Sequence, residues 1–142
     1  MKVSDAMTPG AVIARPHETL RSVARRMAAE DVGFLPVGDG NRLVGTITDR
    51  DIVVRGLANG HDGEALVSDA MTRDVKYCFA DEDMVHVVQN MSANQIRRLP
   101  VVDRDKNLVG VIALADGALK DSPELAGIAL TGIVEPNGHA TA

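Results

Sequence analysis

The opening motif of the chain occurs twice. Residues 3–8 read Val-Ser-Asp-Ala-Met-Thr and return letter for letter at residues 67–72, 64 positions later. Leu-Pro-Val at 35–37 also returns at 99–101. An internal repeat constrains the fold more strongly than other sequence signals. Two copies are too few for a solenoid, so we expect two similar halves related by a pseudo-twofold axis.

Both copies show the same order of polar and apolar residues. Leu20, Val23 and Met27, together with Ala24 and Ala28, follow the spacing of a helical apolar stripe. The elements expected in the first copy are a strand at 11–14, a helix at 20–30, strands at 34–37 and 43–48, and a helix at 49–57. Those expected in the second are a strand at 75–79, a helix capped by Asp83, strands at 99–102 and 108–113, and a helix at 114–119. Each half is therefore predicted to be β-α-β-β-α, an α+β fold with helices covering one face of the sheet.

The repeat register also divides the chain. We expect a first repeat at 1–57, a linker at 58–66 and a second repeat at 67–120. The linker is polar and contains two glycines, Gly60 and Gly63. Residues 121–142 fall outside the repeat and form a C-terminal extension, whose end is expected to be flexible.

Composition narrows the class of protein. Of 142 residues, 45% are apolar, and the formal net charge is −5. No apolar run approaches the roughly 20 residues that a membrane span needs, and the repeat starts too early to leave room for a signal peptide. We therefore expect a cytoplasmic protein with no membrane partner. The acidic balance and the three aromatic residues argue against nucleic-acid binding.

Residue types suited to catalysis or metal binding are present but not grouped. No nucleophile, base and orienting group form a recognisable set, so we expect no catalytic residue and no enzyme. Asp49 and Asp51 stand two residues apart at a helix start and do not converge. The single cysteine, Cys78, is expected to be a small core residue on a strand. The histidines lack metal-ligand spacing, so no metal site is expected; they are His17, His61, His86 and His139.

Residues 48–51, Thr-Asp-Arg-Asp, stand where a predicted strand turns into a helix. T-x-x-D at a helix start is a capping box, in which Thr48 and Asp51 satisfy free backbone N–H groups. The same pair suits a ligand, because a carboxylate accepts hydrogen bonds from a ribose diol and a hydroxyl donates to a phosphate. Spacing leaves both interpretations open, and the two roles are compatible. In the second copy residues 113–116 keep Asp116 but have alanine in place of the threonine.

Four features in this order make the chain resemble the cystathionine β-synthase (CBS) domain family. They are V-S-D-A-M-T, the amphipathic helix, L-P-V-x-D and L-V-G-x-I-T-D-R-D-I. Over about residues 3–119 the tandem resembles a Bateman module, as in small stand-alone CBS-pair proteins of actinobacteria. The resemblance implies tandem CBS repeats with pseudo-twofold symmetry and no required cofactor. It also implies an adenosine ligand, with AMP, ADP or ATP ahead of NAD or S-adenosylmethionine, and a homodimer that forms a flat disk of four repeats.

The resemblance further implies a nucleotide cleft between the repeats. Related nucleotide-binding repeats often carry basic residues before the Leu-Pro pair, and a guanidinium can donate two hydrogen bonds to one phosphate. Here the residues before Leu99 and Pro100 are Arg97 and Arg98. They could equally lie at a solvated helix end and pair with acidic residues. The implied nucleotide-binding residues are Thr48, Asp51, Arg97, Arg98, Phe34, Leu35 and Pro36. A weaker second site would comprise Asp116, Leu99 and Pro100.

Two functions of different classes therefore remain. The first is a non-catalytic regulatory module that binds an adenosine nucleotide between its repeats. It is favoured by the intact motif at 48–51 with basic residues in the other repeat. The second is a ligand-free dimeric scaffold that binds an unknown protein partner. It is favoured by the altered second motif at 113–116 and by the residues after 120.

Overall fold

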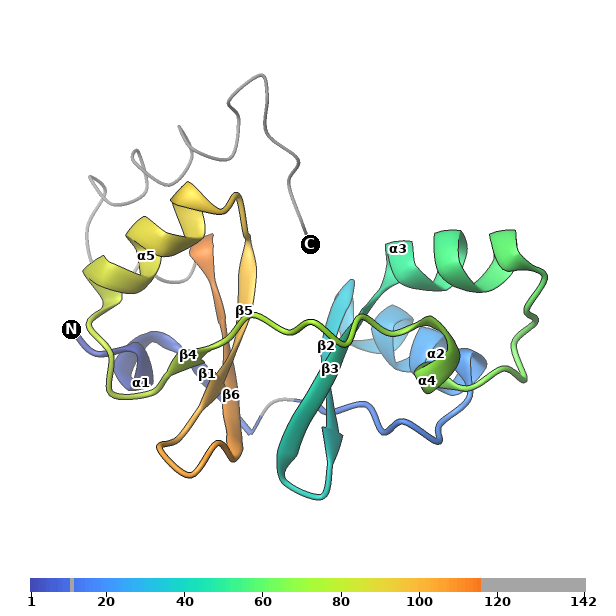
Figure 1. The fold of residues 1–142 in the computed structure, drawn as a ribbon, viewed down its shortest axis with the longest axis horizontal. Helices are drawn as coiled ribbons and strands as arrows, with labels where there is room; N and C mark the ends of the chain where they lie inside the picture. Colours follow the sequence, from blue (N-terminus) through green and yellow to red (C-terminus); the bar gives the residue numbers. More distant parts are fainter. Residues whose placement is uncertain (11, 116–142) are drawn as a thin grey trace. The chain divides into compact units, whose positions relative to one another are not determined.

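The computed structural model describes residues 1–10 and 12–115, which divide between two compact units. One is Val12–Val75, called here the central unit. The other joins Met1–Ala11 to Lys76–Ala142 and is called the terminal unit. The chain therefore leaves the terminal unit after its first residues and returns to it after the central unit is complete (Figure 1).

The central unit is a hairpin with helices. Strands β2 (Phe34–Asp39) and β3 (Arg42–Thr48) pair in antiparallel register, with Leu35 opposite Ile47. Both of these side chains lie in the apolar core of the unit. The helices are α2 (Leu20–Glu30), α3 (Asp49–Asp51), the π-helical turn η1 (Ile52–Gly56), the 3₁₀ turn η2 (Leu57–Asn59) and α4 (Val67–Ala70).

The terminal unit contains a four-stranded sheet in the order β1-β6-β5-β4. Strands β5 and β6 form an antiparallel hairpin, whereas β4 pairs with β5 in parallel. This sheet carries the second core cluster, built around Met84, Met91 and Ile112. The elements are α1 (Val3–Ala6), β1 (Thr8–Pro9), β4 (Cys78–Phe79), α5 (Met84–Ala93), β5 (Arg98–Val102) and β6 (Leu108–Ala113).

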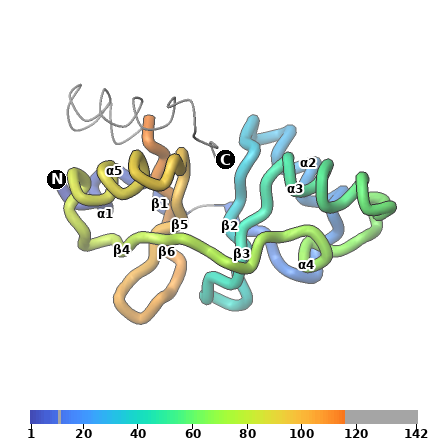
Figure 2. The backbone as a smooth tube through the Cα atoms, turned by 45° about the horizontal axis from the view of Figure 1, so that its top comes forward, coloured from blue at the N-terminus to red at the C-terminus, as the bar shows by residue number. Residues whose placement is uncertain are grey.

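The two copies of the repeated motif occupy each other's half. Helix α1, from the start of the first repeat, lies in the terminal unit beside α5 (Figure 2). Val3 of this helix is fully buried in the core of that unit. Helix α4, from the start of the second repeat, packs into the central unit through Val67. The residue after each motif's methionine then pairs with a hairpin strand: Thr8 lies opposite Val111, and Thr72 lies opposite Thr46.

Side-chain caps fix where the two longer helices begin. The hydroxyl of Thr19 accepts a hydrogen bond from the N–H of Ser22 at 3.1 Å, and α2 follows. The carboxylate of Asp83 accepts from the N–H of Val85 at 3.0 Å, which confirms the predicted cap of α5. None of the described helices combines the length and apolar composition needed to cross a bilayer.

The α+β fold with tandem repeats is confirmed, but the leading strands are shorter than predicted. Of the strand predicted at 11–14, the described residues keep a single bridge between Ala14 and Val37, because Pro36 on the facing strand has no N–H to continue the ladder toward Val12. Of the leading strand predicted at 75–79 in the second repeat, only Cys78–Phe79 is a strand, with Cys78 buried as predicted. The helix predicted at 49–57 begins as α3 and continues as π and 3₁₀ turns.

The apolar stripe of α2 is narrower than predicted. Leu20, Val23 and Met27 are buried, but Ala24 and Ala28 are exposed. Most of the helix predicted at 114–119 and the whole extension at 121–142 lie outside the described residues.

Candidate functional site

Thr48 and Asp51 form a reciprocal capping box at the junction of β3 and α3. The hydroxyl Oγ1 of Thr48 accepts a hydrogen bond from the N–H of Asp51 at 3.0 Å. Carboxylate oxygen Oδ2 of Asp51 accepts from the N–H of Thr48, also at 3.0 Å. Both side chains are half-buried. The structural interpretation of this motif is therefore confirmed, and the question becomes what bonding capacity the two side chains retain.

That remaining capacity can be counted. An ionised carboxylate offers about four acceptor positions, and a hydroxyl offers one donor and two acceptor positions. Thr48 uses its oxygen as an acceptor in the cap, so its own proton is free to donate outward. Asp51 commits one position on Oδ2 to the cap. The pair can hold the helix start and still bind a polar ligand.

Two residues that the sequence analysis missed complete this cluster. The hydroxyl of Thr72 donates to Oδ1 of Asp51 at 3.5 Å, a long contact. Nη1 of Arg55 donates to the carbonyl of Met71 at 3.1 Å and to Oγ1 of Thr72 at 3.2 Å. The sequence contained one signal for Arg55, which stands four residues after Asp51 and therefore on the same face of a helix.

The carboxylate of Asp49 points elsewhere. It lies against the backbone of Gly33, where an added Cβ would stand 2.7 Å from Oδ2 of Asp49. Its Oδ1 accepts from the N–H of Arg50 at 2.8 Å. Among the described residues no group of three His, Cys, Asp or Glu side chains could hold a metal ion.

The three residues expected to line an adenine cleft divide between two faces of β2. Leu35 is 3% exposed and belongs to the core cluster of the central unit. Phe34 and Pro36 are also buried but are not members of that cluster, as expected for alternate positions on a strand. Only the backbone of Leu35 therefore remains for contact on the face of Phe34 and Pro36.

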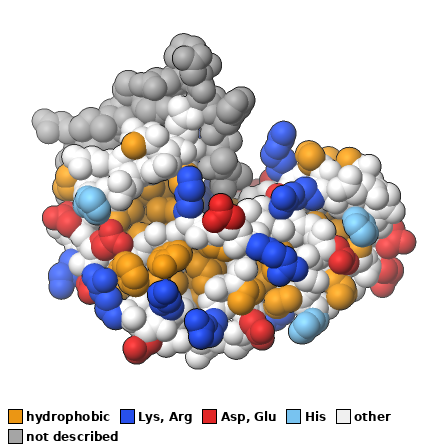
Figure 3. All heavy atoms as spheres, in the orientation of Figure 1, with side chains coloured by type: hydrophobic (Ala, Val, Ile, Leu, Met, Phe, Trp, Pro, Cys, Tyr) orange, Lys and Arg blue, Asp and Glu red, His pale blue; other side chains and the backbone are white. Residues whose placement is uncertain are grey.

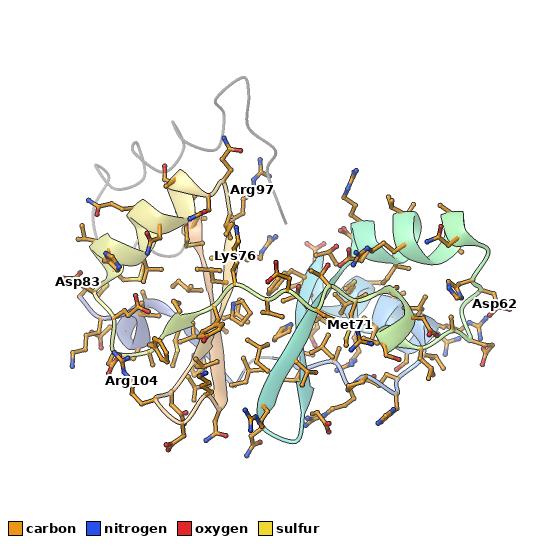
Figure 4. The ribbon with its side chains drawn as sticks, viewed as in Figure 1. Asp62, Met71, Lys76, Asp83, Arg97 and Arg104 are labelled. Carbon is orange, nitrogen blue, oxygen red and sulfur yellow. The ribbon has the colours of Figure 1, made fainter. Side chains whose placement is uncertain are left out.

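Arg97 and Arg98 belong to the terminal unit, at the entry to β5 (Figure 4). Arg97 is exposed and Arg98 is half-buried, and neither side chain forms a hydrogen bond or ion pair with another described residue. The carbonyl of Arg97 accepts from the N–H of Leu114 at 2.8 Å, just as that of Gly33 accepts from Asp49 at 3.0 Å. The two repeats thus share a backbone frame but carry different side chains on it.

The predicted second site is only partly described. Leu99 lies in the core cluster of the terminal unit, and Pro100 is buried outside that cluster. Asp116 lies outside the described residues. Ala113, the counterpart of Thr48, has no hydroxyl to donate.

A hollow of about 490 Å³ lies beside the Arg55 cluster, within the central unit. Arg55 and Arg73 face it together with Asp69 and Asp74, so its charged lining is balanced. Met71, which also lines it, follows α4 directly (Figure 4). Figure 3 likewise shows basic and acidic side chains interspersed over the described part of one face. Neither feature has the single sign of charge that marks a polyanion-binding surface.

Groups with shifted pKa values lie in the terminal unit. Burial, with a smaller contribution from Glu82, raises the pKa of the Cys78 thiol to about 12. A hydrogen bond from Arg104 lowers the pKa of Asp81. The two groups form an exposed ion pair with Nη2 of Arg104 2.7 Å from Oδ1 of Asp81, and the guanidinium carbon lies 4.3 Å above the ring centre of Phe79. This arrangement is structural, because its polar groups are already paired.

Comparison with known proteins agrees with the repeat pattern. The CBS domain model matches residues 3–57 and again residues 67–116. The chain is 40% identical over 138 residues to the CBS domain-containing protein YhcV of Bacillus subtilis, covering 96% of this chain and 98% of the relative. It is 39% identical over 114 residues to Hypoxic response protein 1 of Mycobacterium tuberculosis, covering 79% of each chain.

Two solved structures with bound ligands are also similar. CBSX2 in complex with AMP shares 26% identity and a TM-score of 0.72, over 83% of this chain and 93% of that one. The CBS domain pair of protein MJ0100, in complex with 5-methylthioadenosine and S-adenosylmethionine, shares 29% identity and a TM-score of 0.70, over 82% and 91%. Both the match to the family model and the identity to full-length relatives lead to the same conclusion: this chain belongs to the CBS domain family and contains two CBS repeats.

Proposed function

We propose that this protein is a non-catalytic regulatory module that binds an adenosine nucleotide of the AMP, ADP or ATP class in the cleft between its two CBS repeats. The observation that carries the proposal is the bonding capacity left at the Thr48–Asp51 box, a free hydroxyl proton and unfilled carboxylate positions. The similar CBS pairs that contain AMP, or methylthioadenosine with S-adenosylmethionine, support the adenosine class.

Each proposed contact follows from the chemistry of its side chain. Asp51 accepts two hydrogen bonds from the ribose diol, and Thr48 donates its free proton to a phosphate oxygen. Arg97 or Arg98, whose guanidinium donors have no partner among the described residues, adds bidentate contacts to phosphate. Phe34 and Pro36 supply apolar surface for adenine, and the Leu35 side chain anchors the strand in the core.

The second site is proposed to be the weaker one. It would use Asp116, Leu99 and Pro100, but Ala113 cannot replace the hydroxyl of Thr48. The counterparts of the two arginines in the first repeat are Gly33 and Phe34, which carry no charge. We therefore propose one competent nucleotide site per chain.

Regulation requires that the ligand bind one conformation more tightly than another. We propose that the responding assembly is a homodimer of four repeats. An apolar surface on the central unit supports self-association: Val53, Val54 and Leu57 are 55%, 46% and 60% exposed. The same surface favours the alternative function, a dimeric scaffold without ligand, because it offers contact area whether or not a nucleotide is bound.

Calorimetric titration of AMP into two variants tests the proposal. Asp51→Ala removes charge-assisted hydrogen bonds to the diol, so we expect the affinity to fall at least tenfold, equivalent to about 1.4 kcal/mol or more. Arg98→Ala is expected to weaken AMP binding but to leave adenosine binding within about twofold.

Asp105→Ala and Arg25→Ala are matched controls, since both residues are exposed and their side chains have no hydrogen-bond or ion-pair partner among the described residues. Thermal unfolding of each variant separates loss of the cap from loss of the ligand contact. Normal AMP affinity in both Asp51→Ala and Arg98→Ala would refute the proposed site.

A further inference from the structure

The hydroxyl group of Thr72 lies between the carboxylate of Asp51 and the guanidinium of Arg55 in the central unit. Its Oγ1 is 3.2 Å from Nη1 of Arg55 and 3.5 Å from Oδ1 of Asp51. The three residues come from different segments: Asp51 from α3 and Arg55 from η1 in the first repeat, and Thr72 from the strand-like segment after α4 in the second. Their meeting depends on the exchange of leading motifs between the repeats.

Proton counting fixes the direction of both contacts. A guanidinium group has five N–H donors and no acceptor, so Arg55 can only donate to Thr72. A carboxylate is acceptor-only when ionised, so Asp51 can only accept. The single hydroxyl proton of Thr72 is therefore directed at Asp51, and Arg55 stabilises that orientation by occupying an acceptor position on the same oxygen.

The backbone of Thr72 is itself held in place. Its N–H donates to the carbonyl of Thr46 at 2.8 Å and its carbonyl accepts from the N–H of Thr46 at 2.9 Å. The carbonyl of the preceding Met71 accepts a second bond from Arg55. The hydroxyl is thus carried by a segment hydrogen-bonded to β3, the strand that ends at Thr48.

We propose that Thr72 and Arg55 are positioning residues for the carboxylate of Asp51, and the proposal rests on the proposed function of that carboxylate as the ribose-binding group. Thr48 tethers Oδ2 from one side and Thr72 reaches Oδ1 from the other. A carboxylate held at both oxygens loses less conformational freedom when a ligand binds, which improves affinity. Each oxygen keeps an acceptor position for the ligand.

The test compares isosteric variants by calorimetric titration with AMP. Thr72→Val removes the hydroxyl but keeps the branched shape, and the loss of one long hydrogen bond predicts a two- to tenfold weaker affinity. Thr72→Ser keeps the hydroxyl and is expected to stay within about twofold of wild type. Arg55→Met keeps an unbranched stem without donors and is expected to weaken binding in the same direction as Thr72→Val.

Thr46→Val is the matched control, because Thr46 lies opposite Thr72 and its side chain forms no hydrogen bond with another described residue. We expect its AMP affinity to be unchanged. Equal affinities for wild type and Thr72→Val, or equal losses in Thr72→Val and Thr46→Val, would overturn the proposal.

A ligand-free measurement keeps this proposal separable from the proposed function. Three-bond NMR couplings report the χ1 angle of Thr72, and we expect a single rotamer in the wild type and averaged couplings in Arg55→Met. If the wild type binds no AMP, the proposed function fails, and a fixed rotamer would then support only the orientation of Thr72 by Arg55. Averaged couplings in the wild type would refute the positioning role whatever the titration shows.

Discussion

Replacement of Gly110 by alanine is expected to destabilise the protein because the N-terminal segment lies against this glycine. A Cβ at position 110 would stand 2.7 Å from the carbonyl oxygen of Thr8 and 2.8 Å from Sδ of Met7. The nearer atom belongs to the backbone of β1, which pairs with β6 at this position. Thr8 cannot move without disturbing that pairing, so the added methyl group must shift a strand.

The magnitude follows from two opposing terms. Overpacking of this kind costs about 1–3 kcal/mol. Loss of the conformational freedom of glycine in the unfolded chain returns about 0.4–1 kcal/mol, since no left-handed φ is needed at position 110. Taking the middle of each range, about 2 and about 0.7 kcal/mol, we expect Gly110→Ala to lower the free energy of unfolding by about 1.3 kcal/mol.

Urea denaturation followed by circular dichroism measures this difference. Gly63→Ala is the matched control, because its Cβ would also lie 2.8 Å from another atom, but that atom is Nη2 of the Arg21 side chain. Arg21 is exposed and can rotate away, so a change within about 0.5 kcal/mol is expected. Gly45→Ala, which meets the carbonyl oxygen of Thr72 at 2.8 Å, should behave like Gly110→Ala.

The outcome tests the exchange of the repeated motifs directly. If Gly110→Ala is as mild as Gly63→Ala, residues 7 and 8 do not lie over β6, and the assignment of the first motif to the terminal unit is wrong. If Gly45→Ala destabilises the protein and Gly110→Ala does not, the assignment of the second motif to the central unit is supported and the assignment of the first motif to the terminal unit is not.

Three further predictions follow from the terminal unit. Native Cys78 should react slowly with iodoacetamide at pH 8. Because burial raises the pKa of its thiol to about 12, only the unfolded thiol ionises between about pH 9 and 12, so the free energy of unfolding should decline over this range in pH-dependent denaturation. Arg104→Met should raise the pKa of Asp81, as measured by carboxyl NMR. In the wild type this pKa is lowered in the folded state, so the contribution of the Asp81 carboxylate to stability is present above about pH 4 and is lost as the pH falls further. Asp83→Ala removes the cap of α5 and should cost about 1 kcal/mol in thermal denaturation, whereas Asp105→Ala should cost almost nothing.

Much of the fold could be predicted because its signals are local. The capping residue Asp83, the hairpins and the burial of Leu20, Val23 and Met27 in α2 follow from spacing and side-chain type alone, although the same spacing wrongly included Ala24 and Ala28. The exchange of leading motifs could not be predicted in this way, because two identical copies of V-S-D-A-M-T contain no information about which core each one joins. The leading strands were overestimated for a related reason: an apolar run such as 11–14 predicts burial, but the hydrogen-bonding partners decide the length of a strand.

The features of the candidate site that depend on local sequence could also be predicted, whereas those that depend on distant residues could not. The capping geometry of Thr48 and Asp51 could be predicted from four consecutive letters. Thr72 could not be predicted as their neighbour, since it is far away in sequence and reaches Asp51 only through the exchanged motif. Leu35 was expected to line the cleft together with Phe34 and Pro36, but strand alternation places the Leu35 side chain in the core of the central unit.

The proposed function is tested most directly by one calorimetric titration of AMP into nucleotide-stripped protein. The intact box at Thr48–Asp51 and the missing hydroxyl at Ala113 predict binding in the micromolar range with about one site per chain. Two equivalent sites per chain would contradict the proposed asymmetry between the repeats. Absence of binding heat with AMP, ADP and ATP at two temperatures would contradict the nucleotide-binding function itself and favour the ligand-free scaffold.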